Sequence, residues 1–349
     1  MEIGGRPIGG IVPHTFVIAE LSANHGGQLE AALEIVRAVA DAGVDAIKLQ
    51  TYRPDTITLD HEGELFRISS GTVWDGQTLY RLYAEAQTPW EWHEPIRDEA
   101  LRHGLTWFSS PFDRTAVDLL ESLDVPAYKI ASFEIVDIGL IRRVAATGKP
   151  MIISTGMATL AEIEEAVTAA RAAGATDIAL LKCTSAYPTP PEEVNLRTIP
   201  HLADAFGVPV GLSDHTLGIA VPVAAVALGA VIVEKHVTLR RAGGGLDSGF
   251  SLEPDELAVM VSQIRIAERA LGKVSYVPTE REAGSRSLRR SLFVVEDVRA
   301  GEVYTQDNVR SIRPGYGLHT RHLPDILGRH ATRDIKRGTP MNWDLVAPA

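Results

Sequence analysis

The chain of 349 residues contains a single cysteine, Cys183, so a disulfide within the chain is excluded. The apolar segment 218–229 is too short to cross a bilayer. The first residues, MEIGGRPIGG, lack the charged-then-apolar order of a signal peptide. Since free thiols persist in reducing compartments, these absences predict a cytoplasmic location.

Basic patches are also missing. The net charge is −11, and no run of Lys and Arg interleaved with aromatic residues occurs. This argues against nucleic acid and against an anionic membrane surface as partners. A phosphate-binding loop of the Gly-x-x-x-x-Gly-Lys type and a dinucleotide fingerprint are absent as well, which argues against a nucleotide ligand.

What the sequence does contain is a strand-like run followed by a helical run, repeated eight times. Eight such units predict a (β/α)₈ TIM barrel of the α/β class, whose parallel strands are buried on both faces. The strand candidates are 15–21, 46–51, 105–112, 127–132, 150–156, 178–185, 208–214 and 231–239.

The pattern changes after the barrel, which we assign to residues 1–275. Residues 276–290 are polar without periodicity and are expected to form a linker. Residues 291–349 resume as short β-like pieces separated by Gly and Pro, which predicts a small, mostly-β second domain. Its RPGYGL loop presents Arg313 on a turn, where an arginine is either a solvated charge or a substrate contact.

Two histidines form the most informative pair in the chain. GLSDHT ends one strand at His215 and EKHV ends the next at His236, with 218–229 as the crossover helix between them. Alternation places Ser213 with His215 and Glu234 with His236 on one face of each strand. Each histidine alone could simply bind backbone, but the pair predicts a site for a divalent cation such as Mn²⁺ that acts as a Lewis acid.

Lysines and hydroxyls also follow the strands, at the end of a barrel where catalysis takes place. Such a ring would attract a small polyanion, for example a phosphorylated carboxylate. Its members are Glu20, Lys48, Gln50, Ser109, Ser110, Lys129, Ser132, Ser154, Lys182, Ser213 and Glu234. Cys183 lies among apolar strand residues and is interpreted as a buried filler without chemistry.

The long connection Arg53–Pro89 contains GTVWDGQTLYRLYAEAQTPWEWH. It is too aromatic for a disordered loop, so we expect it to cover the mouth of the barrel. The alternative is a surface excursion packed on itself.

Together these motifs resemble the sialic acid synthase family, and most closely its pseudaminic acid synthase branch. The resemblance runs over nearly the whole chain and implies a (β/α)₈ barrel followed by an antifreeze-like β-clip domain of the SAF type. It is carried by IAELSANHGG, AIKLQTYRPDT, FSSPFD, YKIASFEI, STGMA, LLKCTSAYP, GLSDHT, EKHVTL, RSLFV, NVRSIRPGYGL and RGTP, besides the long connection.

The resemblance implies a carbon–carbon bond-forming transferase. It would condense phosphoenolpyruvate (PEP) with 2,4-diacetamido-2,4,6-trideoxy-altrose and water, giving phosphate and a nine-carbon α-keto acid. N-acetylneuraminate and legionaminic acid synthases are the alternatives within the family. Two rivals lie outside it: a Schiff-base aldolase, and a non-catalytic sugar- or ice-binding protein.

The resemblance also assigns residues. His215 and His236 would hold the metal, Mn²⁺ with Mg²⁺ or Co²⁺ as alternatives. The chemistry of the reaction adds a role that the resemblance does not assign: water must be added, and either Glu20 or Glu234 could orient or deprotonate it. PEP would be bound by Lys48, Ser110, Lys129, Ser132, Ser154 and Ser213. The acetamido sugar would meet Gln50, Glu134, Tyr187, Asp247 and Arg313, the last supplied by the partner in a domain-swapped homodimer.

Overall fold

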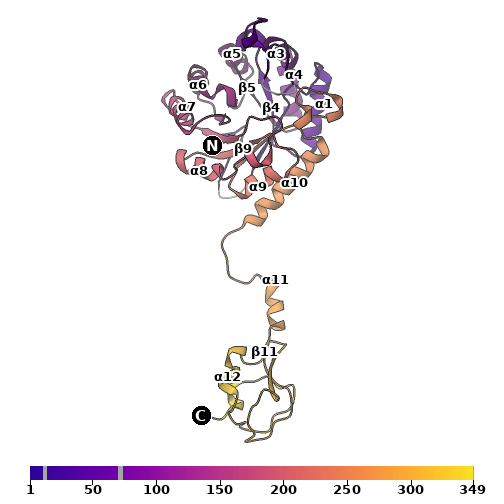
Figure 1. Cartoon of the computed structure of the whole chain (residues 1–349), viewed down its shortest axis with the longest axis vertical. Coiled ribbons are helices and arrows are strands. Elements are labelled where there is room, and N and C mark those ends of the chain that lie inside the picture. The colour runs from indigo at the N-terminus through magenta and orange to yellow at the C-terminus, as the bar shows by residue number, and fades with distance from the viewer. Residues whose placement is uncertain (11–13, 70–73, 349) are drawn as a thin grey trace. The chain divides into compact units, whose positions relative to one another are not determined.

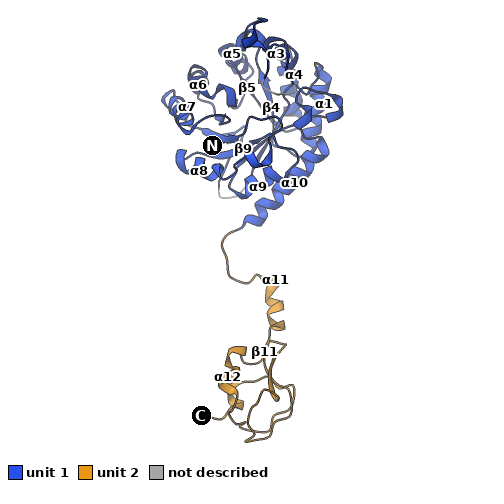
Figure 2. Ribbon diagram, viewed as in Figure 1, with its two compact units in different colours: residues 1–272 blue, residues 273–349 orange. Residues whose placement is uncertain are grey.

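Two compact units, Met1–Gly272 and Lys273–Ala349, make up the chain (Figure 2). The computed structural model describes residues 1–10, 14–69 and 74–348. Each unit has its own hydrophobic core. Within these described ranges, no helix has the length and apolar character needed to cross a membrane.

Eight parallel strands close the first unit into a barrel, in the order β10-β3-β4-β5-β6-β7-β8-β9. The predicted fold is confirmed, and every strand lies inside its predicted range. The strands are β3 (Phe16–Glu20), β4 (Ala46–Thr51), β5 (Thr106–Pro111), β6 (Tyr128–Ile130), β7 (Met151–Ser154), β8 (Ile178–Cys183), β9 (Val210–Asp214) and β10 (Ile232–His236).

Helices surround the barrel strands (Figure 1). They form where apolar residues recur three or four positions apart, as in the first helix, which buries Ile35, Val36 and Val39. Local signals set their ends: Asp113 caps one helix by accepting bonds from the next turn, and Gly207 ends another with a φ of 63°. The helices are α1 (Leu29–Asp41), α4 (His93–Arg102), α5 (Arg114–Ser122), α6 (Ile138–Ala145), α7 (Leu160–Ala172), α8 (Thr198–Phe206), α9 (Ala220–Ala227) and α10 (Pro254–Leu271).

Strands β9 and β10, which carry the two histidines, approach each other closely. A Cβ atom added at Gly211 would lie 2.3 Å from the backbone oxygen of Ile232 and 2.6 Å from its Cβ. Only glycine therefore permits this approach. Parallel pairing aligns Val233 with Leu212, Glu234 with Ser213 and Lys235 with Asp214, so the two polar strand ends stand side by side.

Short strands, helices and turns precede the barrel strands or connect them to the helices. A hairpin of β1 (Glu2–Ile3) and β2 (Arg6–Pro7) begins the chain. In its described residues, the connection predicted to cover the mouth, Arg53–Pro89, contains three pieces; its residues 70–73 lie outside the described residues. The pieces are α2 (Pro54–Ile57), η1 (Glu64–Phe66) and α3 (Leu79–Ala86). Further turns are η2 (Trp90–Trp92), η3 (Ser132–Val136), η4 (Pro191–Glu193), η5 (Arg241–Gly243) and η6 (Ser248–Phe250).

The second unit is small and contains the antiparallel strands of the predicted β-type domain. Strands β11 (Ser291–Val294) and β12 (Val309–Ile312) pair antiparallel, and Arg313 follows directly as an exposed residue. The polar segment expected to be a linker contains α11 (Glu280–Ala283) and η7 (Gly284–Leu288), because Thr279 and Glu282 form a capping box there. The remaining elements are η8 (Thr320–His322), α12 (Leu323–Ile326) and η9 (Trp343–Leu345).

Candidate active site

A cavity of about 1000 Å³ opens at the carboxyl ends of the barrel strands. Twelve of the residues predicted for the site line it: Lys48, Gln50, Lys129, Ser132, Glu134, Ser154, Tyr187, Ser213, His215, Glu234, His236 and Asp247. Glu20 and Ser110 lie just behind this lining and bind Lys48. Arg313 belongs to the second unit.

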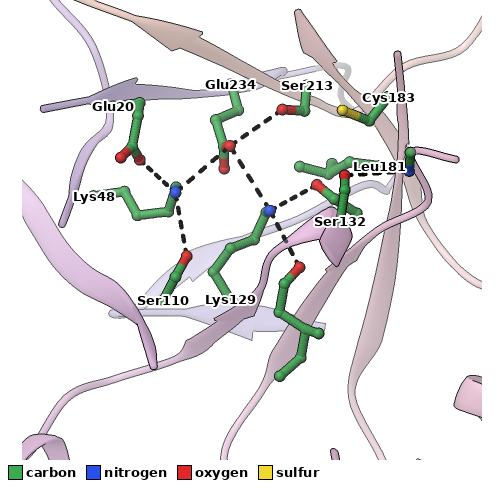
Figure 3. Close-up of polar contacts among 12 residues, drawn as sticks. Glu20, Lys48, Ser110, Lys129, Ser132, Leu181, Cys183, Ser213 and Glu234 are labelled. Atoms are coloured by element: carbon green, nitrogen blue, oxygen red, sulfur yellow. Dashed lines mark hydrogen bonds and ion pairs between the residues drawn. The ribbon is translucent and has the colours of Figure 1, made fainter. Parts of the chain in front are cut away.

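Four buried charged residues lie at the cavity lining or directly behind it, and we call Glu20, Lys48, Lys129 and Glu234 the charged cluster (Figure 3). Lys48 makes an ion pair with Glu20 and lies 3.7 Å from a Glu234 carboxylate oxygen, which is 3.8 Å from Lys129 Nζ. Acids and lysines thus alternate through the cluster. The alternation balances two positive against two negative charges where water is excluded.

Hydroxyl groups complete the surroundings of the two lysines. Lys48 Nζ donates to Ser110 Oγ at 3.3 Å, and Lys129 Nζ donates to Ser154 Oγ at 2.6 Å. Ser213 Oγ donates to Glu234 Oε1 at 3.2 Å. These groups are therefore brought together as predicted, and they can donate to the oxygens of a bound anion.

The two acids of the charged cluster have opposite tendencies. Burial raises the pKa of Glu20 above its ordinary value, although Lys48 opposes the rise. Burial also acts to raise the pKa of Glu234, but Lys129 and Lys48 outweigh it and hold the pKa below the ordinary value. Glu234 is thus the fixed negative charge of the site, and Glu20 is the group better able to accept a proton.

The two lysines also differ. Burial lowers the pKa of Lys129. Burial acts in the same direction on Lys48, but the carboxylates of Glu20 and Glu234 outweigh it and raise the Lys48 pKa. Lys48 is therefore a permanent cation, while Lys129 depends on negative charge nearby, either from Glu234 or from a bound anion.

The histidine pair lies together in the cavity, with the ring centroids of His215 and His236 5.2 Å apart. His215 Nδ1 lies 3.0 Å from the Thr184 carbonyl, which assigns the proton to Nδ1 and leaves a lone pair on Nε2. His236 Nδ1 is buried without a hydrogen-bond partner and lies 3.8 Å from an Asp247 oxygen. Burial holds the pKa of His236 well below its ordinary value, so this imidazole is in the neutral, ligating form.

These observations fit a divalent cation held by two imidazoles. An orphaned nitrogen and a free lone pair in one buried cavity are the donor set that such an ion requires. Among the described residues, no group of three or more His, Cys, Asp or Glu is arranged to hold a metal ion. An ion bound here would therefore keep coordination positions for water or substrate.

Around the histidines the wall is aromatic. The Tyr187 ring lies 4.5 Å from the His215 ring, and the Phe250 ring lies 5.0 Å from the His236 ring. On the other side, Gln50 Nε2 donates to Glu20 Oε1 at 3.0 Å and to Ser22 Oγ at 3.1 Å. Polar amide and flat aromatic surfaces together suit a sugar with acetamido substituents.

The connection Arg53–Pro89 supplies an apolar part of the wall. Its lining side chains include Ile57, Ile68, Leu79, Leu82 and Tyr83. Burial raises the pKa of Glu134, on the wall after β6, to about 7. The segment predicted to cover the mouth thus contributes directly to the cavity wall. Glu134, an acid with a pKa near neutrality, lines the same cavity.

Sequence reasoning missed several residues of the site. Ser22 bonds Asp247, and Phe250 packs against His236, but neither lies on a predicted strand end. Cys183 is buried as expected, yet it lines the cavity with Sγ 3.9 Å from His215 Nδ1. Strand alternation was the signal that could have found it, since Lys182 points the other way, where its Nζ binds the Cys183 carbonyl at 2.7 Å.

Comparison with known proteins identifies relatives of both units. The model of the NeuB family matches residues 35–276, and that of the SAF domain matches residues 289–347. The chain is 46% identical to a pseudaminic acid synthase of Campylobacter jejuni, over 93% of the chain and 94% of that protein. It is 34% identical to an N,N'-diacetyllegionaminic acid synthase of Legionella pneumophila, over 98% of each.

A solved structure agrees with these relatives. The crystal structure of an N-acetylneuraminic acid synthetase from Leptospira borgpetersenii, in complex with citrate, superposes with a TM-score of 0.72 at 33% identity. The match covers 82% of the chain and 94% of that protein.

Proposed function

The chain belongs to the NeuB family, and on this premise we propose that it is a metal-dependent synthase of pseudaminic acid. The reaction joins PEP to 2,4-diacetamido-2,4,6-trideoxy-altrose and adds water, releasing phosphate and a nine-carbon α-keto acid. The observation that carries the proposal is that a charged cluster with two lysines adjoins a histidine pair in one cavity. N-acetylneuraminate and legionaminic acid synthase activities are the alternatives.

PEP is proposed to bind at the charged cluster. It carries close to three negative charges, and the two ammonium groups of the cluster would donate charge-assisted hydrogen bonds to its oxygens, although Glu20 and Glu234 already balance their charge. Ser132, a further predicted contact, accepts from the Gly156 amide at 3.2 Å and so faces the same region. The full proposed set is Lys48, Ser110, Lys129, Ser132, Ser154 and Ser213.

His215 and His236 are proposed to hold Mn²⁺, with Mg²⁺ or Co²⁺ as alternatives. When bound, such an ion would polarise the aldehyde of the sugar as a Lewis acid, which a weak carbon nucleophile requires. The protein's own part is to present the two imidazoles on neighbouring strand ends and to keep the two substrates in reach of each other.

A carboxylate must accept the proton of the attacking water. Glu20 is the better candidate, because burial raises its pKa and makes it the stronger base, whereas two lysines keep Glu234 ionised. Gln50 binds Glu20 directly and would orient it. Glu234 is then assigned to holding the two lysines in place.

The sugar is proposed to lie against Gln50, Glu134, Tyr187 and Asp247. The apolar wall from the connection Arg53–Pro89 favours a sugar that carries a methyl group at C6 and a second acetamido group over one with hydroxyls there. A 6-deoxy, diacetamido sugar therefore fits the cavity better than N-acetylmannosamine.

Arg313 is proposed to reach the sugar from the partner in a domain-swapped homodimer. It is exposed on the turn after β12, so its guanidinium is available to a ligand. A charge-assisted hydrogen bond of this kind contributes about 1.5–3 kcal/mol. We further propose a cytoplasmic location, consistent with a lone cysteine that has no disulfide partner.

The test is phosphate release from PEP with each candidate sugar, after chelation and after metal add-back under anaerobic conditions. We expect activity that requires the metal and is highest with the altrose derivative. Activity insensitive to chelators, together with borohydride trapping of substrate on a lysine, would identify a Schiff-base aldolase instead. Release with no sugar preference, or preference for N-acetylmannosamine, would move the chain to another branch.

A further inference from the structure

Behind the cavity, a second buried ion pair joins the strands that carry the histidines. Lys235 Nζ lies 2.5 Å from Asp214 Oδ2, and both side chains are buried. The two residues are opposite each other in the β9–β10 register. Because side chains alternate along a strand, they point away from the cavity, and neither lines it. They cannot touch a substrate in the cavity.

The ion pair contains the residue before His215 and is hydrogen-bonded to the residue after it. Asp214 precedes this histidine and Thr216 follows it. The Thr216 amide donates to Asp214 Oδ1 at 3.1 Å, and its hydroxyl donates to Asp214 Oδ2 at 3.0 Å. The Lys235 ammonium also donates to the Thr216 carbonyl. These bonds close a tight turn in which the His215 backbone has little freedom.

The same ammonium is tied to the second histidine by the chain itself, because Lys235 directly precedes His236 in β10. One cation therefore connects the backbone on both sides of His215 with the residue next to His236. The rings pack against Tyr187 and Phe250 but have few hydrogen bonds of their own: His215 Nδ1 bonds the Thr184 carbonyl, whereas His236 Nδ1 has no hydrogen-bond partner. Their spacing depends on the backbone beneath them.

We propose that Asp214, Thr216 and Lys235 form a strand staple that holds His215 and His236 at the spacing needed to bind a divalent cation. The members are positioning residues, and the inference rests on the proposed metal site. A buried ion pair is seldom retained for stability alone, since apolar residues of the same volume serve stability equally well. Groups that orient metal ligands, by contrast, typically change metal affinity 10- to 100-fold when removed.

The key variant is the double substitution Asp214→Asn with Lys235→Met. Each single substitution leaves one buried charge unpaired and should destabilise the protein strongly, whereas the double variant removes both charges at similar volume. Its melting temperature should therefore recover above those of the single variants. If the staple positions the histidines, Mn²⁺ affinity will remain about 10-fold weaker or more despite this recovery.

A milder pair of variants uses Thr216. Thr216→Val removes the hydroxyl donor to Asp214 and should weaken Mn²⁺ binding, but by less than the double variant does. Thr216→Ser keeps a hydroxyl and should bind Mn²⁺ with the wild-type affinity. The matched control is Arg265→Met, because Arg265 pairs with buried Asp45 at 3.0 Å, next to the opposite end of β4. This control should lower the melting temperature without changing Mn²⁺ affinity.

Binding is measured on the metal-free full chain by titration with Mn²⁺, following the EPR signal of the free ion, alongside thermal unfolding. Wild-type affinity in the double variant would overturn the inference, as would affinity losses that simply follow melting temperature in all variants, Arg265→Met included. No saturable Mn²⁺ binding by the wild-type chain would sink the proposed metal site and the staple with it. Mn²⁺ binding without phosphate release would overturn the proposed function alone, because the comparison of affinities would still decide the staple.

Discussion

Replacing Glu234 by glutamine tests whether the two buried lysines are the cations that receive a phosphate group. The Glu234 carboxylate lies 3.7 Å from Lys48 Nζ and 3.8 Å from Lys129 Nζ. Its removal leaves both ammonium groups buried, with Glu20 as the remaining acid of the charged cluster. An ion pair at such distances is worth roughly 4 kcal/mol at an effective dielectric constant of about 20.

The loss of stability should be large. Removing one partner from a buried ion pair costs about 3–5 kcal/mol, because the other charge stays uncompensated. For a unit of this size, each kcal/mol lowers the melting temperature by about 2–4 °C, so we expect a fall of about 6–20 °C. Inorganic phosphate should replace the missing negative charge, and it should therefore stabilise the variant more than the wild-type chain.

The assay is thermal unfolding of both proteins at constant ionic strength, with and without phosphate. Asp118→Asn is the matched control, because it removes the same formal charge from an ion pair with Arg143 at 2.6 Å, and that pair is exposed. Exposed ion pairs contribute little to stability, so the melting temperature of the control should differ only slightly from that of the wild type. Phosphate should raise it no more than it raises that of the wild type. Equal stabilisation of wild type and Glu234→Gln by phosphate would refute the assignment of Lys48 and Lys129.

Four further predictions follow from the site. His215→Ala and His236→Ala should keep the fold and lose metal-dependent turnover, with Mn²⁺ affinity falling at least 10- to 100-fold; normal Mn²⁺ binding with most activity retained would show that the ligands are wrong. Leu82→Asn should reduce the preference in kcat/KM for the 6-deoxy diacetamido sugar over N-acetylmannosamine by about 10-fold or more, and an unchanged ratio would remove the connection from the specificity determinants. Burial raises the pKa of Glu134 to about 7, so the folded state holds a proton that the unfolded state has lost between about pH 4.5 and 7, and stability should fall as pH rises through that window. The urea midpoint of unfolding should be lower at pH 8 than at pH 5 in the wild type, and this difference should be absent in Glu134→Gln. An equal difference in both proteins would contradict the raised pKa of Glu134. Co-refolded Arg313→Ala and His236→Ala subunits should regain activity above the sum of the separate variants, and no recovery in demonstrated heterodimers would exclude the swapped dimer.

Much of the barrel was predictable because it depends on information local to each strand. Period-2 alternation placed Ser213 with His215, and Glu234 with His236, on the inner face, and the structure has the two rings 5.2 Å apart. Strand limits were predictable because Gly and polar clusters bound each apolar run. The roles within the site came from motif resemblance, and the geometry brings together every proposed residue of the barrel.

Pairing between strands could not be predicted in the same way. Alternation tells which face a side chain takes, but a partner depends on register, and register in a barrel is set by the stagger of all eight strands together. Lys48 is opposite Glu20, and Lys235 is opposite Asp214, only because β3–β4 and β9–β10 adopt the registers observed. A shift of two residues would keep every face and break both ion pairs.

The observed registers have their largest effect on the charge balance of the site. Lysines at the mouth were expected to form a positive ring, whereas Lys48 and Lys129 are matched by Glu20 and Glu234 within the charged cluster. A balanced cluster can stay folded while empty, since Lys48 and Lys129 each have a carboxylate nearby as counter-charge. In the proposed reaction, a trianion such as PEP would bind through the lysines' remaining donors and make the net charge of the site negative. A divalent cation held by the two proposed imidazole ligands, His215 and His236, would offset that excess.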